Sequence, residues 1–471
     1  MTSTPTASPA PALTFVGGAG TVTGSKTLLD TPSGRILIDC GLFQGRKELR
    51  LQNWADFPVD PASIDAVLLT HAHIDHCGYL PRLVEAGFSG PVHCTIGTSR
   101  LASIVLPDSG HLHEEEAAYA NRKGYSKHHP AEPLYTEAAA RASLELFHPI
   151  DFDEEVSVLA DVSATWRRAG HILGAAWIDL HVASAGDGRG KHVVFSGDLG
   201  RQTHPLLVAP TPLDAPDVVI TESTYGDRVH EHVDPADVIA DTVNEAARRG
   251  GVVVIPAFAV DRTEIILHHL DRLVAAGRIP NLPVFVDSPM ALSALEVYRD
   301  EARRASPEIR PEFHGAELFP SLQLHEARSV ERSMEINARH GPMIIISASG
   351  MATGGRILHH LSQRMSDDRN AIMLVGFQAP GTRGDLLRRG ERSVKLLGRH
   401  RAVRARVVSV ELSAHADQHE LVDWASTAAT PPEIVYVNHG EPDASAALVG
   451  RLESEAGLIA VAARPGERVL V

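Results

Sequence analysis

A short apolar run that ends in a cluster of histidine and aspartate constrains this chain more than any other stretch. Residues 64–69 suit a buried strand, and the motif HxHxDH follows, formed by His71, His73, Asp75 and His76. Imidazole nitrogens and carboxylate oxygens are ligands that zinc and similar divalent ions accept. At a strand end His71 and His73 point the same way, so both can bind one ion. Asp75 and His76 follow at a turn and face a second ion.

Two isolated polar residues further along would help to complete these metal spheres. His171 lies between Gly170 and Gly174, and Asp198 follows the apolar run 193–195. Either residue alone is more often structural than a ligand, but the first cluster is two or three ligands short of closing two metal sites. We therefore predict three ligand groups: His71, His73 and His171 on one ion, Asp75 and His76 on the other, and Asp198 bridging both. One histidine is still missing from the second group.

The composition is that of a globular protein with sizeable cores, because 44% of its 471 residues are hydrophobic. A formal net charge of −15 argues against bulk attraction to nucleic acid or anionic membranes, although a local basic cleft is compatible with it. Three cysteines suit a reducing compartment, and Cys77 is interpreted as a buried thiol. The sequence has neither a signal-peptide pattern nor an apolar run long enough for a membrane span. We expect a cytoplasmic protein without membrane contact.

The predicted strands follow one another closely in the first part of the chain, whereas helices separate them in the later part. Residues 13–39 indicate strands joined by a glycine-rich turn, and Asp39 at a strand end could hold a ligand histidine by its second ring nitrogen. From about 228 to 408, apolar strands alternate with helical segments, for example 251–256 followed by 263–275. This alternation favours a parallel α/β layer.

Three later motifs join the predicted ligands in the order of a known family. They are Thr221-Glu222-Ser223-Thr224-Tyr225, Ser413-Ala414-His415-Ala416-Asp417 and Asn438-His439-Gly440. Together with HxHxDH and the two isolated ligands, they make the chain resemble the metallo-β-lactamase fold and, within it, the β-CASP nucleases. The resemblance runs from about Leu13 past Gly440. It is closest to bacterial relatives of the endonuclease subunit of the eukaryotic mRNA 3′-end cleavage machinery.

The resemblance implies an α/β fold, namely a four-layer αββα metallo-β-lactamase sandwich with an inserted parallel α/β β-CASP domain. The implied organisation is a flexible N-terminus at 1–12, the first part of the sandwich at 13–227, the insert at 228–408 and the last part of the sandwich at 409–471. The chain departs from the family at Asp261, where relatives usually have glycine.

The resemblance also assigns roles to single residues. His439 would be the missing ligand of the second ion. His415 would be the general acid, with Glu222 holding its other ring nitrogen. Asp75 is counted among the catalytic residues as well as among the ligands. Two divalent ions, zinc first and manganese as an alternative, would supply a bridging hydroxide for attack on phosphorus.

The same resemblance implies RNA as the substrate, because a histidine in the third motif is similar to the RNA-acting branches of the family. The expected activity is hydrolysis of phosphodiester bonds in single-stranded RNA by an endonuclease, with a 5′-to-3′ exonuclease as an open addition. Single-stranded DNA is a second substrate that this chemistry allows.

Two features of the insert fit a phosphodiester substrate. A loop of small residues precedes the helix-like run from 357, and Ser349, Gly350 and Arg356 are its expected phosphate-binding residues. Residues 381–406 contain nine Lys or Arg against two acidic residues, which makes a basic island in an acidic protein. This island could be a track for a nucleic-acid backbone.

Two other functions stay open at this point. A small-molecule metallo-hydrolase of the thioesterase or lactonase type would use the same metals but has no need for the insert or for His415. An inactive RNA-binding scaffold would be free to lose ligands, and the complete ligand set argues against it. A homodimer is left open as well.

Overall fold

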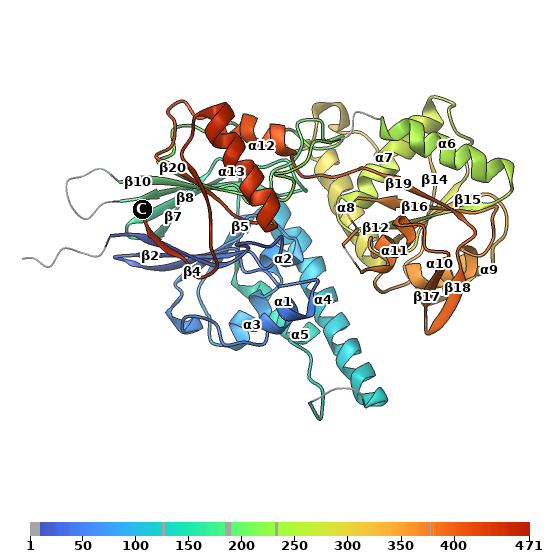
Figure 1. Cartoon of the computed structure of the whole chain (residues 1–471), viewed down its shortest axis with the longest axis horizontal. Helices are drawn as coiled ribbons and strands as arrows, with labels where there is room; N and C mark the ends of the chain where they lie inside the picture. Colours follow the sequence, from blue (N-terminus) through green and yellow to red (C-terminus); the bar gives the residue numbers. More distant parts are fainter. Residues whose placement is uncertain (1–9, 125–127, 184–189, 231–233, 377, 380) are drawn as a thin grey trace, which may run out of the picture. The chain divides into compact units, whose positions relative to one another are not determined.

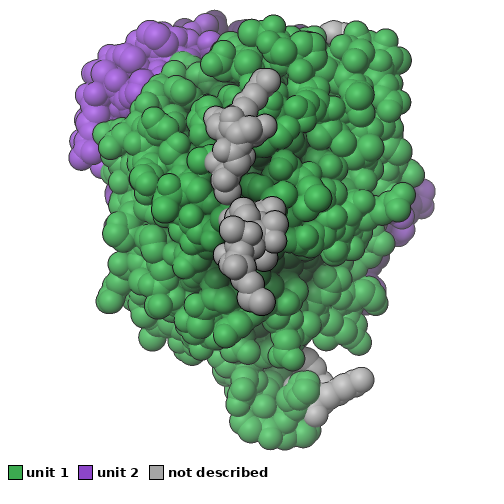
Figure 2. Space-filling model, turned by 90° about the vertical axis from the view of Figure 1, so that its left-hand side faces the viewer, with its two compact units in different colours: residues 1–204, 208–229, 415–471 green, residues 205–207, 230–414 purple. Residues whose placement is uncertain are grey.

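The computed structural model describes residues 10–124, 128–183, 190–230, 234–376, 378–379 and 381–471, so most of the predicted flexible N-terminus lies outside it. The chain divides into two compact units, which Figure 2 colours separately. Unit 1 contains residues 1–204, 208–229 and 415–471, and unit 2 contains residues 205–207 and 230–414. The chain therefore leaves unit 1 for unit 2 and returns for its last two motifs. The expected domain boundaries after residues 227 and 408 stay a prediction.

The first sheet of unit 1 has the strand order β22-β1-β2-β3-β4-β5-β6. Its strands are β1 (Ala12–Gly17), β2 (Lys26–Thr31), β3 (Gly34–Ile38), β4 (Ala66–Leu68), β5 (Val92–Thr95), β6 (Phe147–Ile150) and β22 (Arg468–Leu470). β1, β2, β3 and β22 pair antiparallel, whereas β3, β4, β5 and β6 pair parallel. The sheet is therefore mixed.

The second sheet of unit 1 has the order β21-β20-β11-β10-β9-β8-β7. Its strands are β7 (Glu155–Leu159), β8 (Val162–Arg168), β9 (Ala176–Val182), β10 (Lys191–Phe195), β11 (Val218–Thr221), β20 (Ile434–Val437) and β21 (Ala460–Ala462). β10, β11, β20 and β21 pair parallel, and β7 to β10 pair antiparallel. Returning strand β20 thus pairs directly with β11, which precedes the excursion into unit 2.

The two sheets enclose a common apolar core. Alternate residues of each strand face inward, as the period of two in a strand requires. Phe15 and Leu68 come from the first sheet, and Trp166, Ile178 and Val193 come from the second. The indole nitrogen of Trp166 also donates to the backbone oxygen of Leu69, at 3.0 Å, so the core is tied to the start of the metal motif.

Helices cover both outer faces of this sandwich (Figure 1). Those beside the first sheet are α1 (Lys47–Gln52), α2 (Ile74–Cys77), α3 (Leu80–Glu85), α4 (Ile96–Lys123) and α5 (Glu137–Ser143). Those beside the second sheet are α12 (Gln418–Ala425) and α13 (Pro442–Ala456). Unit 1 therefore has the four-layer αββα order that the sequence predicts.

Unit 2 is built on an all-parallel sheet with the order β14-β13-β15-β12-β16-β19. Its strands are β12 (Val252–Ala257), β13 (Pro283–Val286), β14 (Gln323–Glu326), β15 (Met343–Ala348), β16 (Ala371–Val375) and β19 (Arg406–Val410), with the separate hairpin β17 (Ser393–Leu396) and β18 (Arg399–Ala402). Its helices are α6 (Pro235–Arg248), α7 (Arg262–Ala275), α8 (Pro289–Arg303), α9 (Val330–Ala338), α10 (Ile357–Arg364) and α11 (Arg383–Arg388). This is the parallel α/β layer expected from the alternation in the sequence.

The topology of unit 1 brings several strand ends to one edge. Parallel strands β3 and β4 end before Asp39 and Thr70, and parallel strands β10, β11 and β20 end before Asp198, Glu222 and His439. Loops after the carboxyl ends of parallel strands meet on the same side of a sheet, where such folds place their sites. Among the described residues no helix is long and apolar enough to cross a membrane.

Candidate active site

Four buried or half-buried donors from three separate loops form the first cluster of the site. His71 Nε2 lies 3.1 Å from His73 Nδ1, and His171 Nε2 lies 3.2 Å from the same atom. Asp198 Oδ2 lies 3.5 Å from His71 Nε2 and 3.6 Å from His171 Nε2. A tetrahedral zinc site with ligand bonds of about 2.0–2.1 Å has edges of about 3.3–3.4 Å. The four donors thus have the spacing of one tetrahedral ion.

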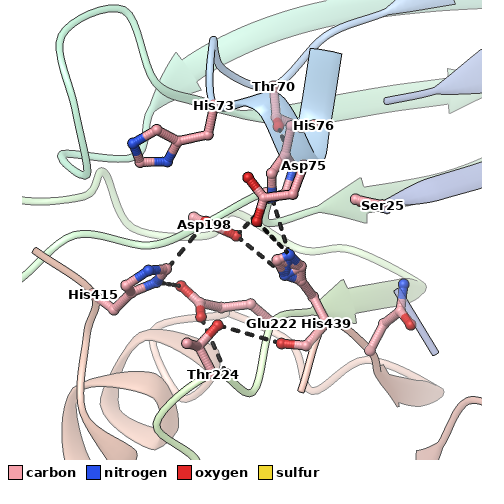
Figure 3. A network of polar contacts seen from close by, with 12 residues as sticks. Ser25, Thr70, His73, Asp75, His76, Asp198, Glu222, Thr224, His415 and His439 are labelled. Atoms are coloured by element: carbon pink, nitrogen blue, oxygen red, sulfur yellow. Dashed lines mark hydrogen bonds and ion pairs between the residues drawn. The ribbon is translucent and has the colours of Figure 1, made fainter. Parts of the chain in front are cut away.

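A second cluster lies beside the first and shares one carboxylate with it. His76 Nε2 lies 3.1 Å from His439 Nε2 and 3.2 Å from Asp198 Oδ1. Asp75 Oδ2 completes the group, 3.8 Å from His439 Nε2. Asp198 therefore turns one oxygen toward each cluster, as Figure 3 shows for the second. Its Oδ1 is buried and has no hydrogen-bond donor within the described residues, which fits an atom that binds a cation.

The electrostatics of the two clusters favour bound cations. Burial lowers the pKa of His71 to about 4 and that of His73 to about 3, so both rings are neutral bases at pH 7. Burial also opposes a charge on His76, but Asp198 and Asp39 outweigh it and raise the pKa of that ring well above its usual value. The surrounding carboxylates thus attract positive charge at the ring nitrogen that faces the cluster.

Hydrogen bonds behind the clusters fix which nitrogen of each ring faces an ion. Asp39 Oδ2 accepts from His76 Nδ1 at 2.7 Å, which is the contact expected from its place at a strand end. Thr70 Oγ1 lies 3.1 Å from His71 Nδ1 and donates to Asp39 Oδ1 at 2.9 Å. Both rings therefore carry a proton on Nδ1 and turn Nε2 toward the site.

Backbone hydrogen bonds hold the helix that carries Asp75 and His76. The backbone N–H of Ser25 donates to Asp75 O at 2.8 Å, and that of Cys40 donates to His76 O at 2.7 Å. Gly41 allows this approach, because a Cβ at that residue would lie 1.6 Å from the carbonyl oxygen of Asp75. The ligands of α2 are thereby placed by the residue before β2 and the segment after β3.

His415 and Glu222 adjoin the first cluster, on the side away from His76 (Figure 3). His415 Nδ1 lies 3.3 Å from Glu222 Oε1 and 3.9 Å from Asp198 Oδ2. Glu222 is buried, and its Oε1 also accepts from the backbone N–H of Leu199 at 2.6 Å. Asp417, two residues after His415, begins α12 with a capping box and so fixes the path of the loop. The imidazole can lose or gain a proton at Nε2 while Glu222 holds Nδ1.

The three expected phosphate-binding residues all lie in unit 2, after β15. The guanidinium group of Arg356 is bound by its own protein: Nη1 donates to Asp287 Oδ1 at 2.8 Å and to Ala327 O at 3.0 Å. Ser349 Oγ accepts from the backbone N–H of Thr353 at 3.2 Å. These contacts hold the Arg356 side chain in the loop, and phosphate binding by Ser349, Gly350 and Arg356 stays a prediction. The metal-ligand candidates all come together in unit 1.

Thr70, Thr224 and the glycine-rich turn also belong to the site, although the sequence alone assigned no role to them. Thr224 Oγ1 donates to His439 O at 3.3 Å, and the backbone N–H of His439 donates to Gly18 O at 3.0 Å. Thr70 precedes His71 directly, and Thr224 belongs to the same motif as Glu222, which is the signal that could have found them. The partner of Gly18 is 421 positions away, and no local pattern predicts it.

Comparison with known families places these observations in context. Residues 20–101 match the metallo-beta-lactamase superfamily, residues 263–387 the Beta-Casp domain, and residues 401–463 the Zn-dependent metallo-hydrolase RNA specificity domain. Ribonuclease TTHA0252 of Thermus thermophilus is 36% identical over 458 residues, which cover 97% of this chain and 99% of that protein. This chain belongs to the β-CASP family of metallo-β-lactamase-fold ribonucleases. The family and fold predicted from the sequence are thereby confirmed.

Other β-CASP relatives are similar over most of this chain. Transcription termination factor FttA of Methanothermobacter thermautotrophicus is 32% identical over 448 residues, 91% of this chain and 67% of that protein. The RNase J-like protein of Methanocaldococcus jannaschii is 29% identical over 435 residues, 91% of this chain and 92% of that protein. A crystal structure from Enterococcus faecalis, described as a protein of unknown function, covers 98% of this chain and is itself covered completely, with a TM-score of 0.53 and 14% identity. At that identity it supports the fold alone.

Proposed function

We propose that this β-CASP enzyme hydrolyses phosphodiester bonds of single-stranded RNA at a site that holds two divalent ions. The observation that carries the proposal is the carboxylate of Asp198, whose two oxygens face two separate groups of ligand atoms. One ion would be held by His71, His73 and His171. The other would be held by Asp75, His76 and His439, and Asp198 would bind both.

The donor set fits zinc, and manganese is the alternative. Imidazole with some carboxylate is the usual zinc environment, whereas sites rich in oxygen favour manganese or magnesium. The match of residues 401–463 to a Zn-dependent metallo-hydrolase domain supports the same choice. When bound, such a pair of ions lowers the pKa of water toward about 7 and neutralises charge on the phosphoryl group.

The residues of the chain supply positioning and proton transfer. Asp39 and Thr70 hold the rings of His76 and His71 in one tautomer, so that no reorientation is needed when substrate binds. His415 would donate a proton from Nε2 to the departing ribose 3′ oxygen, while Glu222 holds the opposite nitrogen. The ribose 2′-hydroxyl is not required as a nucleophile, which is why some cleavage of single-stranded DNA is expected.

RNA is supported as the substrate by relatives and by composition. One relative is named a ribonuclease, another an RNase J-like protein, and residues 401–463 match an RNA specificity domain. In unit 2 the hairpin of β17 and β18 carries exposed Arg392, Lys395 and Arg399 near or within its strands. These side chains can neutralise phosphates along a single strand.

Cleavage of one RNA carrying a label at its 5′ end or at its 3′ end tests the proposal. The metal-free protein would be loaded with zinc or with manganese and given each RNA, with a nitrophenyl thioester as a control substrate. Internal fragments from both labelled RNAs indicate endonuclease activity, and early release of a labelled 5′ mononucleotide indicates exonuclease activity. Hydrolysis of the thioester without cleavage of either RNA would refute the proposed substrate.

A further inference from the structure

Lys26 is a buried cation that none of the steps proposed above uses. It belongs to β2, and only 3% of the residue is exposed. Its ammonium group donates a hydrogen bond to the backbone oxygen of Gly41. Burial lowers the pKa of Lys26 to about 8, so the amine is still mostly protonated at pH 7. Removing this charge from water costs free energy of folding, a cost that an apolar side chain of similar shape would avoid.

Two aromatic rings enclose the ammonium group of Lys26. Its Nζ atom lies 4.5 Å from the ring centroid of Phe43 and 4.9 Å from that of Tyr79, distances at which a ring face attracts a cation. The Phe43 backbone is held by Asn53, whose Oδ1 accepts from its N–H at 2.9 Å and whose Nδ2 donates to its oxygen at 2.8 Å. The ring of Tyr79 stacks on that of Phe57, with centroids 6.0 Å apart. These contacts fix the two rings, and the rings hold the ammonium group in place.

The hydrogen bond from Lys26 orients a peptide group that binds α2. Gly41 O and the N–H of Leu42 belong to the same planar peptide group, and that N–H donates to Ile74 O at 2.9 Å. A cation bonded to the oxygen polarises the peptide group, which strengthens donation by its N–H. Lys26 therefore acts on α2 through one rigid peptide group.

Helix α2 depends on contacts of this kind, because it has only four residues and a single helical turn is not stable by itself. The carbonyl oxygens of Asp75 and His76 are held by the backbone hydrogen bonds described above. The bond from Leu42 to Ile74 O is the third such contact. All three come from the residue before β2 or from the segment after β3, and Lys26 fixes the last of them.

We propose that Lys26 is a positioning residue for Asp75 and His76, the ligands that α2 supplies to the second cluster. The inference rests on the proposed function, since it requires an ion in that cluster. Without the ammonium group Gly41 O loses its donor, and the peptide group that holds α2 is less restrained. Ordering the two ligands around an ion then costs more conformational entropy. The second cluster should therefore bind its ion more weakly.

Zinc binding by the full chain at buffered free zinc concentrations tests this role. Lys26→Met removes the ammonium group and leaves an unbranched apolar side chain. Leu28→Met is the matched control, because Leu28 is buried on the same face of β2, two residues further on. Elemental analysis should show that one zinc binds to Lys26→Met about tenfold more weakly than to the wild type, an effect expected for outer contacts of metal ligands. The control should bind zinc as the wild type does.

Anomalous scattering at the zinc edge shows which cluster has lost its ion. Crystals of Lys26→Met at limiting zinc should keep the peak of the first cluster, whose three histidines lie outside α2, and lose most of the peak of the second. RNA cleavage by this variant should be slow at limiting zinc and return toward the wild-type rate at saturating zinc. A residue that only supported the fold would weaken both clusters alike and would lower the melting temperature of the metal-free protein.

The outcomes separate this inference from the proposed function. Equal zinc binding by the wild type and Lys26→Met would overturn the inference and leave the two-ion site intact. An equal loss of affinity in both clusters would also overturn it. A wild type without an ion in the second cluster would overturn the proposed function, and the inference with it. Lys26→Leu removes the same donor and provides the same comparison if Lys26→Met does not fold.

Discussion

Replacement of His415 by alanine separates proton donation from metal binding. The His415 ring meets Glu222 Oε1 through Nδ1 at 3.3 Å and stands 3.9 Å from Asp198 Oδ2, so it adjoins the ligand clusters while Glu222 holds its Nδ1. We expect the His415→Ala variant to retain both metals and to bind RNA nearly normally. Its cleavage rate should fall because the departing 3′ oxygen then lacks its proton donor.

The size of this effect follows from the usual contribution of a positioned acid. A general acid contributes about 10²–10⁴-fold in rate. At about 1.36 kcal/mol for each factor of ten, the variant loses about 2.7–5.4 kcal/mol of transition-state stabilisation. A nitrophenyl phosphodiester has a leaving group that needs no proton, so its hydrolysis should decline much less. The ratio between the losses on the two substrates is therefore the quantity to measure.

Single-turnover cleavage and elemental analysis of the same preparations complete the assay. His419→Ala is the matched control, because His419 lies four residues on, is exposed, and bonds to Arg451 Nη2 instead of the active site. It should behave as the wild type. Equal losses on RNA and on the nitrophenyl substrate would refute the acid role. Loss of a metal from the variant would instead make His415 a ligand, since Asp198, Glu222 and His415 can also surround one ion.

Three further changes test other parts of the protein. Asp198→Ala should lose both ions and all cleavage together, measured by elemental analysis, because its two oxygens serve both clusters. Changing Arg392, Lys395 and Arg399 together to glutamine should weaken RNA binding and lower the slope of log affinity against log salt by up to about 2, at about 0.7 for each phosphate contact. Burial and the charge of Asp261 raise the pKa of buried Glu264 well above its usual value of 4.5. The free energy of unfolding should therefore fall as the pH rises above 4.5, because the folded state holds this proton more tightly than the unfolded state. Thermal melts of Glu264→Gln at several pH values should show a smaller decline than those of the wild type.

Each of these predictions has a result that contradicts it. Full occupancy of both clusters in Asp198→Ala would exclude a bridging role. The triple variant needs a control with the same loss of charge, for which we choose the exposed residues Arg248, Arg303 and Arg304. Equal salt slopes in the two triple variants would make the hairpin an ordinary solvated surface. A pH profile of Glu264→Gln that matches the wild type would mean that the glutamate is not kept neutral by the fold.

The sequence predicts the ligand candidates because their signals are local. HxHxDH follows β4, and Asp198, Glu222 and His439 follow β10, β11 and β20, so each was visible as a polar residue after an apolar run. His439 entered the ligand set through the resemblance to the family. That these residues lie at one edge of the sheets follows only if the parallel strands before them end on the same side. His171 had the weakest local signal, and only the need for another ligand brought it into the set.

The contacts of Arg356 could not be predicted in the same way, because its partner is distant in sequence. Asp287 is buried at the end of β13, 69 positions earlier, and it accepts from both Arg356 and His360. Arg388 and Arg389 of the basic island are similar, since both bind the buried carboxylate of Asp385. A count of charges along the chain does not reveal which are already neutralised, and this is why the salt experiment uses other residues of the island.

Asp261 stands where members of the family usually have glycine, and its backbone has a conformation that glycine favours. The residue has φ 68°, a conformation that glycine adopts without strain, and it precedes α7 directly. Its Oδ1 accepts from the hydroxyl of Tyr298 at 2.8 Å, a bond that glycine could not make. Asp261 thus combines a strained backbone with a buried side-chain contact, and that contact offsets part of the strain.

The second metal cluster depends on the return of the chain from unit 2. His439 follows β20, which pairs in parallel with β11 so that Val437 stands opposite Thr221. This register places Asn438 and His439 beside Glu222 and Ser223, and the backbone N–H of Ser223 donates to His439 O at 3.2 Å. Asp75, His76 and the shared Asp198 all precede the excursion into unit 2, but the fourth protein donor, His439, arrives only when the last segment has added its strand to the second sheet. Full affinity for the second ion should therefore coincide with completion of unit 1, and ion binding should in turn stabilise that last pairing.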